Sequence, residues 1–425
     1  MIVYFKVGNY KSIKDPVVIN FTATSIGEHY ESNVIKTDKD ELLKTVMLYG
    51  PNASGKSKIL DALVFLRWSV LNSATDRHSH ERINTEAFAL NTTSKEQPSF
   101  FEAEFIVGKI KYRYGFEADV EAVRKEWLME IKATTSNVLF LRIEQDFKIE
   151  NKFAEARGLE KRTRRNALFL SVAAQWSVPR AENIAGWFDS IYTVHGMMDS
   201  FYAGMTTSML NEKPYDRMIN DLMREADLGI NSLYALDMPE QVREDILRNA
   251  PPELLDGYKE RLSNNRKAVF AMHNVFNDEG TVKDEVAFGM DSVESEGTRK
   301  FFNLSGVFVH AALSGRLVVI DEFDARLHTL LIKAIIRLFN SAELQSGAQL
   351  FAVSHDTALL DKELLRRDQI YFVEKTNVGA TQVTTLVEYK PRKESPYFKN
   401  YLEGKYVAIP FITQFENSIR HGKES

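Results

Sequence analysis

The chain has 425 residues, which is long enough for a large hydrophobic core with an inserted lobe. Its 44% hydrophobic and 27% charged residues are ordinary for a soluble globular protein. The absence of cysteine excludes disulfides, thiolate zinc sites, iron–sulfur clusters and cysteine nucleophiles. The net charge of −5 excludes a uniformly basic surface for nucleic acid, so any DNA contact would require a local basic patch.

The sequence also predicts where the protein resides. No apolar run reaches the ~18 residues that a membrane helix needs. The first residues lack the basic and apolar regions of a secretory signal. Because the lack of cysteine also fits a reducing compartment, we expect a cytoplasmic protein without a membrane partner.

The first half of the chain alternates between predicted strands and one helix. Alternating apolar residues predict strands within residues 1–22, and residues 45–49 form a short apolar strand that runs into a glycine. From Ser57 onward, apolar residues recur at helical spacing. Strict alternation over residues 99–145, with a turn at Gly108-Lys109, predicts antiparallel strands.

The second half predicts a helical insertion followed by a return to mixed structure. Residues from about 195 to 275 are rich in Met, Leu and charge with helical spacing, while residues 285–390 alternate between strands and helices. We therefore expect an α/β protein in three segments: 1–195, an inserted helical lobe at 196–280, and 281–425.

A phosphate-binding loop follows the apolar strand at 45–49. The segment matches G-x-x-x-x-G-K-[ST] at every fixed position. Backbone N–H groups and the helix N-terminus would form an anion nest, the lysine would add charge at the β- and γ-phosphates, and the serine hydroxyl would reach Mg²⁺. The alternative is a chance glycine-rich turn before a helix. The predicted nucleotide-binding residues are Gly50, Pro51, Asn52, Ala53, Ser54, Gly55, Lys56 and Ser57.

A second motif ends another apolar strand, at residues 317–320. Asp321 at this strand end would hold Mg²⁺ through its water shell. Glu322 follows and would act as the general base that polarises the attacking water. The alternative is a strand that ends in a solvated acidic turn.

The two motifs stand 265 residues apart, which indicates the ABC/SMC branch of phosphate-loop proteins. The chain resembles ABC-type ATPases related to SMC, RecF and OLD proteins, and in particular the AAA-family ATPases of bacterial abortive-infection and anti-phage operons of the RloA, AbiL and AriA kind. Besides the two motifs, the resemblance is carried by Asn9–Ser12, Ala226–Ile230, Ser295–Thr298, Asp324–His328, Ser354–Asp356 and Tyr401–Tyr406. It implies an ABC-ATPase head with a P-loop mixed sheet, an antiparallel β lobe and an inserted helical lobe.

The resemblance also implies roles for individual residues. Ser295, Gly297 and Thr298 would form the signature motif that grips the γ-phosphate held by the opposite subunit, although this segment lacks the double glycine of transporters. A polar helix N-cap is the simpler interpretation of the same residues, and both can hold. Residues 324–328 would form the D-loop at a dimer interface. His355, after an apolar strand, would be the switch histidine, with a structural histidine as the alternative.

Two further candidates are weaker. Gln175, after the apolar run at 168–171, is the candidate Q-loop glutamine and metal ligand. Lys11 would touch phosphate or ribose, with solvated surface as the alternative. The resemblance thus names Glu322, Lys56 and His355 as catalytic, and ATP and Mg²⁺ as the cofactors.

A signature motif far from its own phosphate loop implies two chains that bind ATP head-to-tail, as a dimer or a higher homo-oligomer. By family analogy the protein is a sensor or scaffold in anti-phage defence that controls a separate effector, such as a TOPRIM-like or other nuclease. Only 70 residues follow His355, so we expect no fused nuclease. A phage component or DNA is a further candidate partner; the basic run at 161–165 would contact DNA phosphates, with an ordinary charged helix face as the alternative. The alternatives are a RecF/SMC-like DNA-repair ATPase and an ATP-gated scaffold with negligible turnover.

Overall fold

The computed structural model describes residues 1–75, 78, 80–132, 135–226, 228–249, 259, 267–390 and 396–406. These residues divide into two compact units. The phosphate-loop unit comprises Ile2–Asp189 with the residues from Val353 onward, and the 190–352 unit comprises Ser190–Ala352 with Met1. None of the helices in the described ranges combines the length and hydrophobicity that crossing a bilayer requires.

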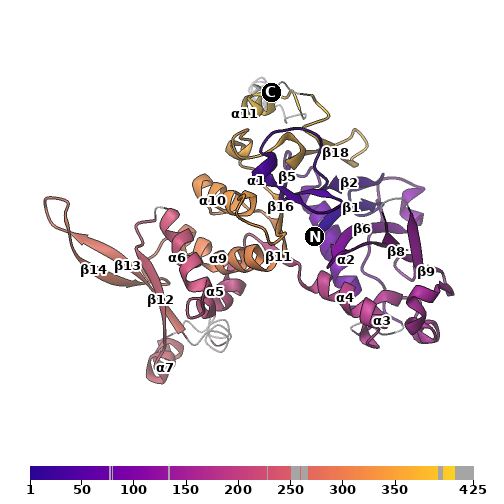
Figure 1. Cartoon of the computed structure of the whole chain (residues 1–425), viewed down its shortest axis with the longest axis horizontal. Coiled ribbons are helices and arrows are strands. Elements are labelled where there is room, and N and C mark those ends of the chain that lie inside the picture. Colours follow the sequence, from indigo (N-terminus) through magenta and orange to yellow (C-terminus); the bar gives the residue numbers. More distant parts are fainter. Residues whose placement is uncertain are drawn as a thin grey trace, which may run out of the picture. The chain divides into compact units, whose positions relative to one another are not determined.

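A seven-stranded sheet with the order β10-β9-β8-β7-β6-β1-β2 forms one layer of the phosphate-loop unit (Figure 1). Every neighbouring pair is antiparallel. This confirms the predicted strands over 1–22 and 99–145, with the turn at Gly108. The strands are β1 (Ile2–Gly8), β2 (Val17–Asn20), β6 (Ser99–Val107), β7 (Ile110–Ala118), β8 (Val123–Ile131), β9 (Ser136–Ile143) and β10 (Asp146–Ile149).

Helices cover one face of this sheet because alternate strand residues there are apolar. Phe101 and Phe105 of β6 are fully buried. The Phe101 ring lies 5.0 Å from that of Phe65, and Phe105 stacks on Trp187 at 4.2 Å. The helices are α2 (Lys56–Asn72), α3 (Phe169–Gln175) and α4 (Pro179–Asp189).

A second group of strands carries the phosphate loop in the same unit. Every residue of β5 (Thr45–Tyr49) is buried, and β5 pairs in parallel with β17 (Ile370–Lys375). β18 (Thr381–Thr385) pairs antiparallel with β17. Because β5 and β17 are parallel, their carboxyl ends lie at one edge, where the phosphate loop begins. Smaller elements are α1 (Tyr30–Asn33), β3 (Val34–Lys36), β4 (Glu41–Leu43) and α11 (Tyr397–Leu402).

The 190–352 unit contains a parallel group of strands flanked by helices. β15 (Leu317–Asp321) pairs in parallel with β11 (Tyr192–His195) on one side and with β16 (Gln349–Val353) on the other. Two amphipathic helices accompany these strands, α9 (Glu296–Ser314) and α10 (Thr329–Asn340).

The predicted helical lobe at 196–280 is only partly helical. It contains α5 (Ala203–Met209), α6 (Tyr215–Glu225) and α7 (Glu240–Asn249), but also β12 (Ser232–Asp237) and β13 (Lys267–Phe276). β13 pairs across residue 280 with β14 (Val282–Gly289), and the three strands form an antiparallel sheet in the order β12-β13-β14. The helical prediction was wrong for β13 because its buried residues, Val269 and Ala271, recur at a spacing of two.

Candidate active site

The phosphate loop connects β5 to α2 as the sequence predicts, with Gly55 as the N-cap of the helix. Gly55 has a φ of 108°, which side-chain-bearing residues avoid. A Cβ there would also lie 2.0 Å from Thr381 Oγ1, so glycine is required both by backbone conformation and by the packing of β18. The loop geometry is therefore fixed by tertiary contacts as well as by the motif.

Lys56 is the first residue of α2, and only 4% of its surface is exposed. Its Nζ donates 2.8 Å hydrogen bonds to the carbonyl oxygens of Gly50 and Pro51. A buried ammonium group held inside the loop is placed to interact with an anion there rather than with bulk solvent.

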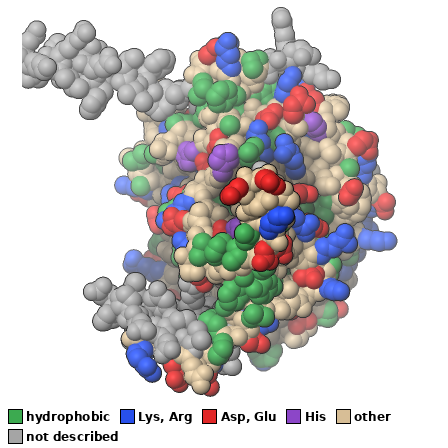
Figure 2. Space-filling view, turned by 90° about the vertical axis from the view of Figure 1, so that its left-hand side faces the viewer, with side chains coloured by type: hydrophobic (Ala, Val, Ile, Leu, Met, Phe, Trp, Pro, Cys, Tyr) green, Lys and Arg blue, Asp and Glu red, His purple; other side chains and the backbone are tan. Residues whose placement is uncertain are grey.

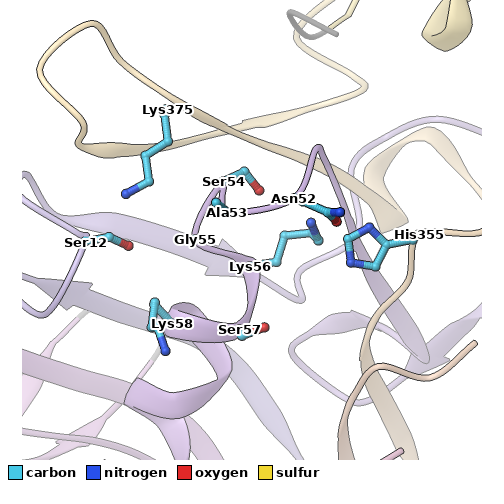
Figure 3. A pocket seen from close by; sticks show the side chains of 10 residues that line it. All are labelled: Ser12, Asn52, Ala53, Ser54, Gly55, Lys56, Ser57, Lys58, His355 and Lys375. Atoms are coloured by element: carbon cyan, nitrogen blue, oxygen red, sulfur yellow. The ribbon is translucent and has the colours of Figure 1, made fainter. Parts of the chain in front are cut away.

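The loop forms one wall of a cavity of about 330 Å³ (Figure 3). Its ten lining residues include three lysines and no carboxylate, which suits a polyphosphate. Figure 3 shows the His355 ring beside Lys56 and Asn52. The structure thus brings His355 to the phosphate loop. The lining residues are Ser12, Asn52, Ala53, Ser54, Gly55, Lys56, Ser57, Lys58, His355 and Lys375.

A second cavity of about 390 Å³ shares Ser12, Lys58 and Lys375 with the first. Its other lining residues are Lys11, Gly379 and the segment 86–90. The backbone N–H of Lys11 donates to the Glu86 carbonyl at 2.7 Å, and its ammonium group pairs with Asp61 at 3.1 Å. Lys11 therefore lies at the neighbouring cavity rather than in the phosphate loop's own cavity.

Asn9 holds the 86–98 segment against this second cavity. Its Nδ2 donates to the carbonyls of Ser94 and Gln97 at 2.8 Å each, and its Oδ1 accepts from the Phe88 N–H at 3.1 Å. In the sequence, Asn9 contributes only to the family resemblance. The structure gives it a local function, which is to position the wall of the cavity.

Lys375 lines both cavities and was missed by the sequence analysis. It ends β17, whose carboxyl end lies beside that of β5, and this strand position was the available signal. Its Nζ donates to the Gly379 carbonyl at 2.8 Å, and burial lowers the pKa of Lys375. It is the third lysine of the loop cavity, besides Lys56 and Lys58.

Asp321 and Glu322 belong to the 190–352 unit. Residues 317–320 of β15 are buried, and Asp321 is half-buried at the strand's carboxyl end. The Glu322 N–H donates to Asp321 Oδ1 at 3.0 Å, and Glu322 has a φ of 50°. The strand and its acidic end are as predicted, while the approach of both carboxylates to the nucleotide stays a prediction.

Ser295 is the N-cap of α9, which agrees with the simpler interpretation of this segment. Its Oγ accepts from the Thr298 N–H at 3.1 Å. Ser295 is exposed, Gly297 is half-buried and Thr298 is buried. The exposed cap leaves the N-terminus of α9 accessible to an anion.

The predicted D-loop packs against this signature segment within the same unit. Arg326 pairs with Glu296 at 2.9 Å, and the Lys300 ammonium group donates to the Ala325 carbonyl. A Cβ on Gly297 would lie 3.1 Å from the Arg326 carbonyl oxygen. The two segments, far apart in sequence, therefore form one continuous surface.

Gln175 does not reach either cavity. It is exposed at the last position of α3, and the apolar run at 168–171 leads into this helix. The helix is fixed at its start by Glu126, whose carboxylate accepts from the N–H groups of Phe169 and Leu170 at 2.7 and 2.9 Å. The geometry of the described residues gives no support to Gln175 as a metal ligand.

The basic run at 161–165 is partly engaged in packing. The Arg162 guanidinium lies 4.1 Å from the Trp176 ring centroid, and Arg164 donates to the Ala74 carbonyl at 2.9 Å. Within the stretch 226–230 that contributed to the family resemblance, Asp227 lies outside the described residues.

The model of a family described as "AAA domain, putative AbiEii toxin, Type IV TA system" matches residues 46–361. This range includes the phosphate loop, Asp321, Glu322 and His355. No curated protein matches the chain.

Three of the solved structures that resemble the chain are SMC heads that each cover 90% of its length. They are the SMC head domain from Thermotoga maritima (12% identity, 98% of that chain, TM-score 0.41), an SmcHead bound to the C-winged helix domain of ScpA (14%, 97%, 0.43), and an Smc head domain with an extended coiled coil bound to the C-terminal domain of ScpA derived from Pyrococcus furiosus (13%, 96%, 0.37).

Proposed function

The chain belongs to this AAA-domain family, and from that premise we propose that it binds ATP between two head-to-tail copies and hydrolyses it. Its α/β fold is that of an ABC-type ATPase head, with a phosphate loop, an antiparallel β lobe and a parallel strand group that ends in two carboxylates. The observation that carries the proposal is the cavity at the loop, with its three lysines, no carboxylate and the adjacent His355.

The two cavities suggest how ATP would lie. The triphosphate would occupy the cavity at the phosphate loop, where Lys56 and the N–H groups at the start of α2 offset its charge. The nucleoside would occupy the second cavity, where the exposed side chain of Leu90 provides apolar surface. The shared residues Lys58 and Lys375 would lie near the junction between phosphate and ribose.

Ser57 and Asp321 are the proposed magnesium ligands. The Ser57 hydroxyl lines the loop cavity, and the Asp321 carboxylate is a hard oxygen ligand of the kind the ion prefers. When bound, the ion would neutralise charge on the phosphate oxygens. Glu322 would take the proton of the attacking water, and His355 would donate to the γ-phosphate from the cavity wall.

The second copy would supply the N-terminus of α9. Ser295 is exposed there, and Arg326 of the adjoining D-loop contributes a cation. A helix N-terminus stabilises an anion by up to ~2 kcal/mol in partly buried geometries. Such a contact, made only when ATP is bound, lets ATP hold two copies together and lets hydrolysis release them.

The family description, with its putative AbiEii toxin, supports a role in defence. We propose that the nucleotide-dependent assembly acts as a sensor or scaffold for a separate effector, for which a nuclease is the first candidate. The DNA-repair alternative would require a basic patch for DNA. Figure 2 shows acidic and basic side chains interspersed on one face of the molecule, and Arg162 and Arg164 of the basic run are engaged in packing.

Turnover and nucleotide binding test this proposal together. Wild type should hydrolyse Mg-ATP, Lys56→Ala should lose ATP binding, and Glu322→Gln should bind ATP and assemble while its turnover falls by about a hundredfold or more. Unchanged ATP affinity in Lys56→Ala would refute the site. If wild type and Glu322→Gln both assemble with ATP and neither hydrolyses it measurably, the protein is an ATP-gated scaffold.

A further inference from the structure

The backbone of Glu322 adopts a conformation that its neighbours must maintain. Its φ of 50° lies in the left-handed region, which costs a residue with a side chain about 1 kcal/mol or more. Two hydrogen bonds support it. The Glu322 N–H donates to Asp321 Oδ1 at 3.0 Å, and the Ala325 N–H donates to the Glu322 carbonyl at 3.0 Å. The direction of the glutamate side chain therefore depends on the packing of this short turn.

Gly196 is pressed against that turn from the neighbouring strand. β11 runs parallel to β15 with His195 opposite Asp321, and the Gly196 N–H donates to the Asp321 carbonyl at 2.9 Å. A Cβ on Gly196 would lie 2.0 Å from the carbonyl oxygen of Glu322 and 2.8 Å from its carbonyl carbon. Side-chain-bearing residues cannot approach a backbone so closely, so only glycine fits here.

The segment that follows Gly196 is fastened to α9, the helix that begins at Ser295. Asn303 Nδ2 donates to Asp199 Oδ2 at 2.7 Å. From the other side, Lys300 of α9 donates to the carbonyl of Ala325, in the turn that follows Glu322. The turn is thus held between β11 and α9.

We propose that Gly196 is a positioning residue for the water-activating carboxylate. By having no side chain, it lets the chain leaving β11 pack on the peptide after Glu322, and this contact fixes the direction in which the Glu322 carboxylate points. The inference rests on the proposed role of Glu322 as general base. It goes beyond that role by assigning the orientation of this base to a residue that lies more than 100 positions earlier in the chain.

Gly196→Ala is the direct test. Relief of a 2.0 Å contact moves the Glu322 peptide by about 1 Å, and a displacement of that size costs on the order of a hundredfold in rate. We expect kcat to fall by about that factor, while the Kd for ATP stays within about twofold because no nucleotide-binding residue is touched. Hydrogen exchange at the Ala325 amide should accelerate, because its acceptor is the displaced carbonyl.

Two matched variants separate positioning from general destabilisation. In Gly315→Ala the new Cβ would lie 2.2 Å from the Ser346 carbonyl oxygen, a clash of the same kind at the other end of β15. It should lower Tm but leave kcat per folded molecule unchanged. Gly186→Ala lies in the interior of α4, where a Cβ would meet nothing within 4 Å and alanine favours the helix, so it should leave kcat unchanged without lowering Tm.

The outcomes distinguish this inference from the proposed function. If the Ala325 amide in Gly196→Ala exchanges hydrogen at the wild-type rate and the variant hydrolyses ATP as wild type does, the positioning inference is overturned. The proposed ATPase activity then still stands. If wild type itself has no turnover, the general-base role fails, and exchange at Ala325 still reports whether Gly196 holds the turn. Should Gly196→Ala fail to fold, Asn303→Ala releases the segment at its other anchor, and an unchanged kcat there would also overturn the inference.

Discussion

Replacing Glu126 by alanine should strongly destabilise the antiparallel lobe. The Glu126 carboxylate is completely buried on β8 and accepts hydrogen bonds from the Phe169 and Leu170 N–H groups and from the Tyr114 hydroxyl. It also lies 3.5 Å from the fully buried guanidinium of Arg142. Alanine would leave two N–H groups at the start of α3 without this acceptor and a buried cation without its counter-charge.

The magnitude follows from which groups lose their partners. Arg142 keeps hydrogen bonds to the carbonyls of Glu144 and Ala167, so its donors remain partly satisfied while its charge does not. Removing one partner of a buried ion pair costs about 3–5 kcal/mol. Glu126→Gln keeps one acceptor oxygen and should cost roughly 2 kcal/mol. Either loss is a large fraction of the ~5–15 kcal/mol that stabilises a domain.

Urea denaturation followed by tryptophan fluorescence measures this loss, since Trp127 lies on β8. Glu150→Ala is the matched control, because its pair with Lys148 is exposed and should contribute less than ~1 kcal/mol. A Glu126→Ala protein within 1 kcal/mol of the Glu150→Ala control would refute the reasoning that this pair organises the start of α3.

Three further predictions follow from single contacts. Ser295→Ala removes the cap of α9 and should lower the free energy of unfolding, measured by denaturation, by ~1 kcal/mol. Ser295→Glu should in addition abolish ATP-dependent assembly, measured by light scattering, and assembly like that of wild type would contradict the signature role. Asn9→Ala removes the hydrogen bonds that hold the 86–98 segment at the second cavity. In calorimetry it should weaken the binding of ATP but not that of inorganic triphosphate, and equal weakening of both would contradict the proposed nucleoside position. Burial and the charge of Arg316 lower the pKa of His310. As the pH drops below about 6.5, the unfolded state therefore takes up the proton before the folded state does, and the free energy of unfolding should fall. Denaturation midpoints of His310→Gln that change with pH as those of wild type do between pH 5 and 7 would contradict this.

Local patterns predicted the elements that surround the phosphate loop. The apolar run at 45–49, the motif itself and the helix after Ser57 appear as β5, the loop and α2 because each is specified by neighbouring residues. The strands over 99–145 were predictable because one face of the sheet is buried, which imposes a spacing of two.

The site features that could not be predicted from the sequence depend on contacts between distant segments. Lys375 reaches the cavity only because β17 pairs with β5, and Gly196 is required only because β11 pairs with β15. Gln175 lines neither cavity, because it ends a helix that is fixed by Glu126, more than 40 positions earlier, and its role as a metal ligand stays a prediction. Such long-range relations leave no periodic signal in one sequence.

The central claim is that each copy completes the other's nucleotide site. An equimolar mixture of Lys56→Ala and Ser295→Glu, each inactive alone, tests it most directly by steady-state ATP hydrolysis. Neither variant should pair with itself, while head-to-tail pairing gives every mixed pair one intact site of two, so turnover should rise to at most about half that of wild type. Turnover that stays at the level of the separate variants, although light scattering shows that mixed pairs form, would contradict a site shared between two chains.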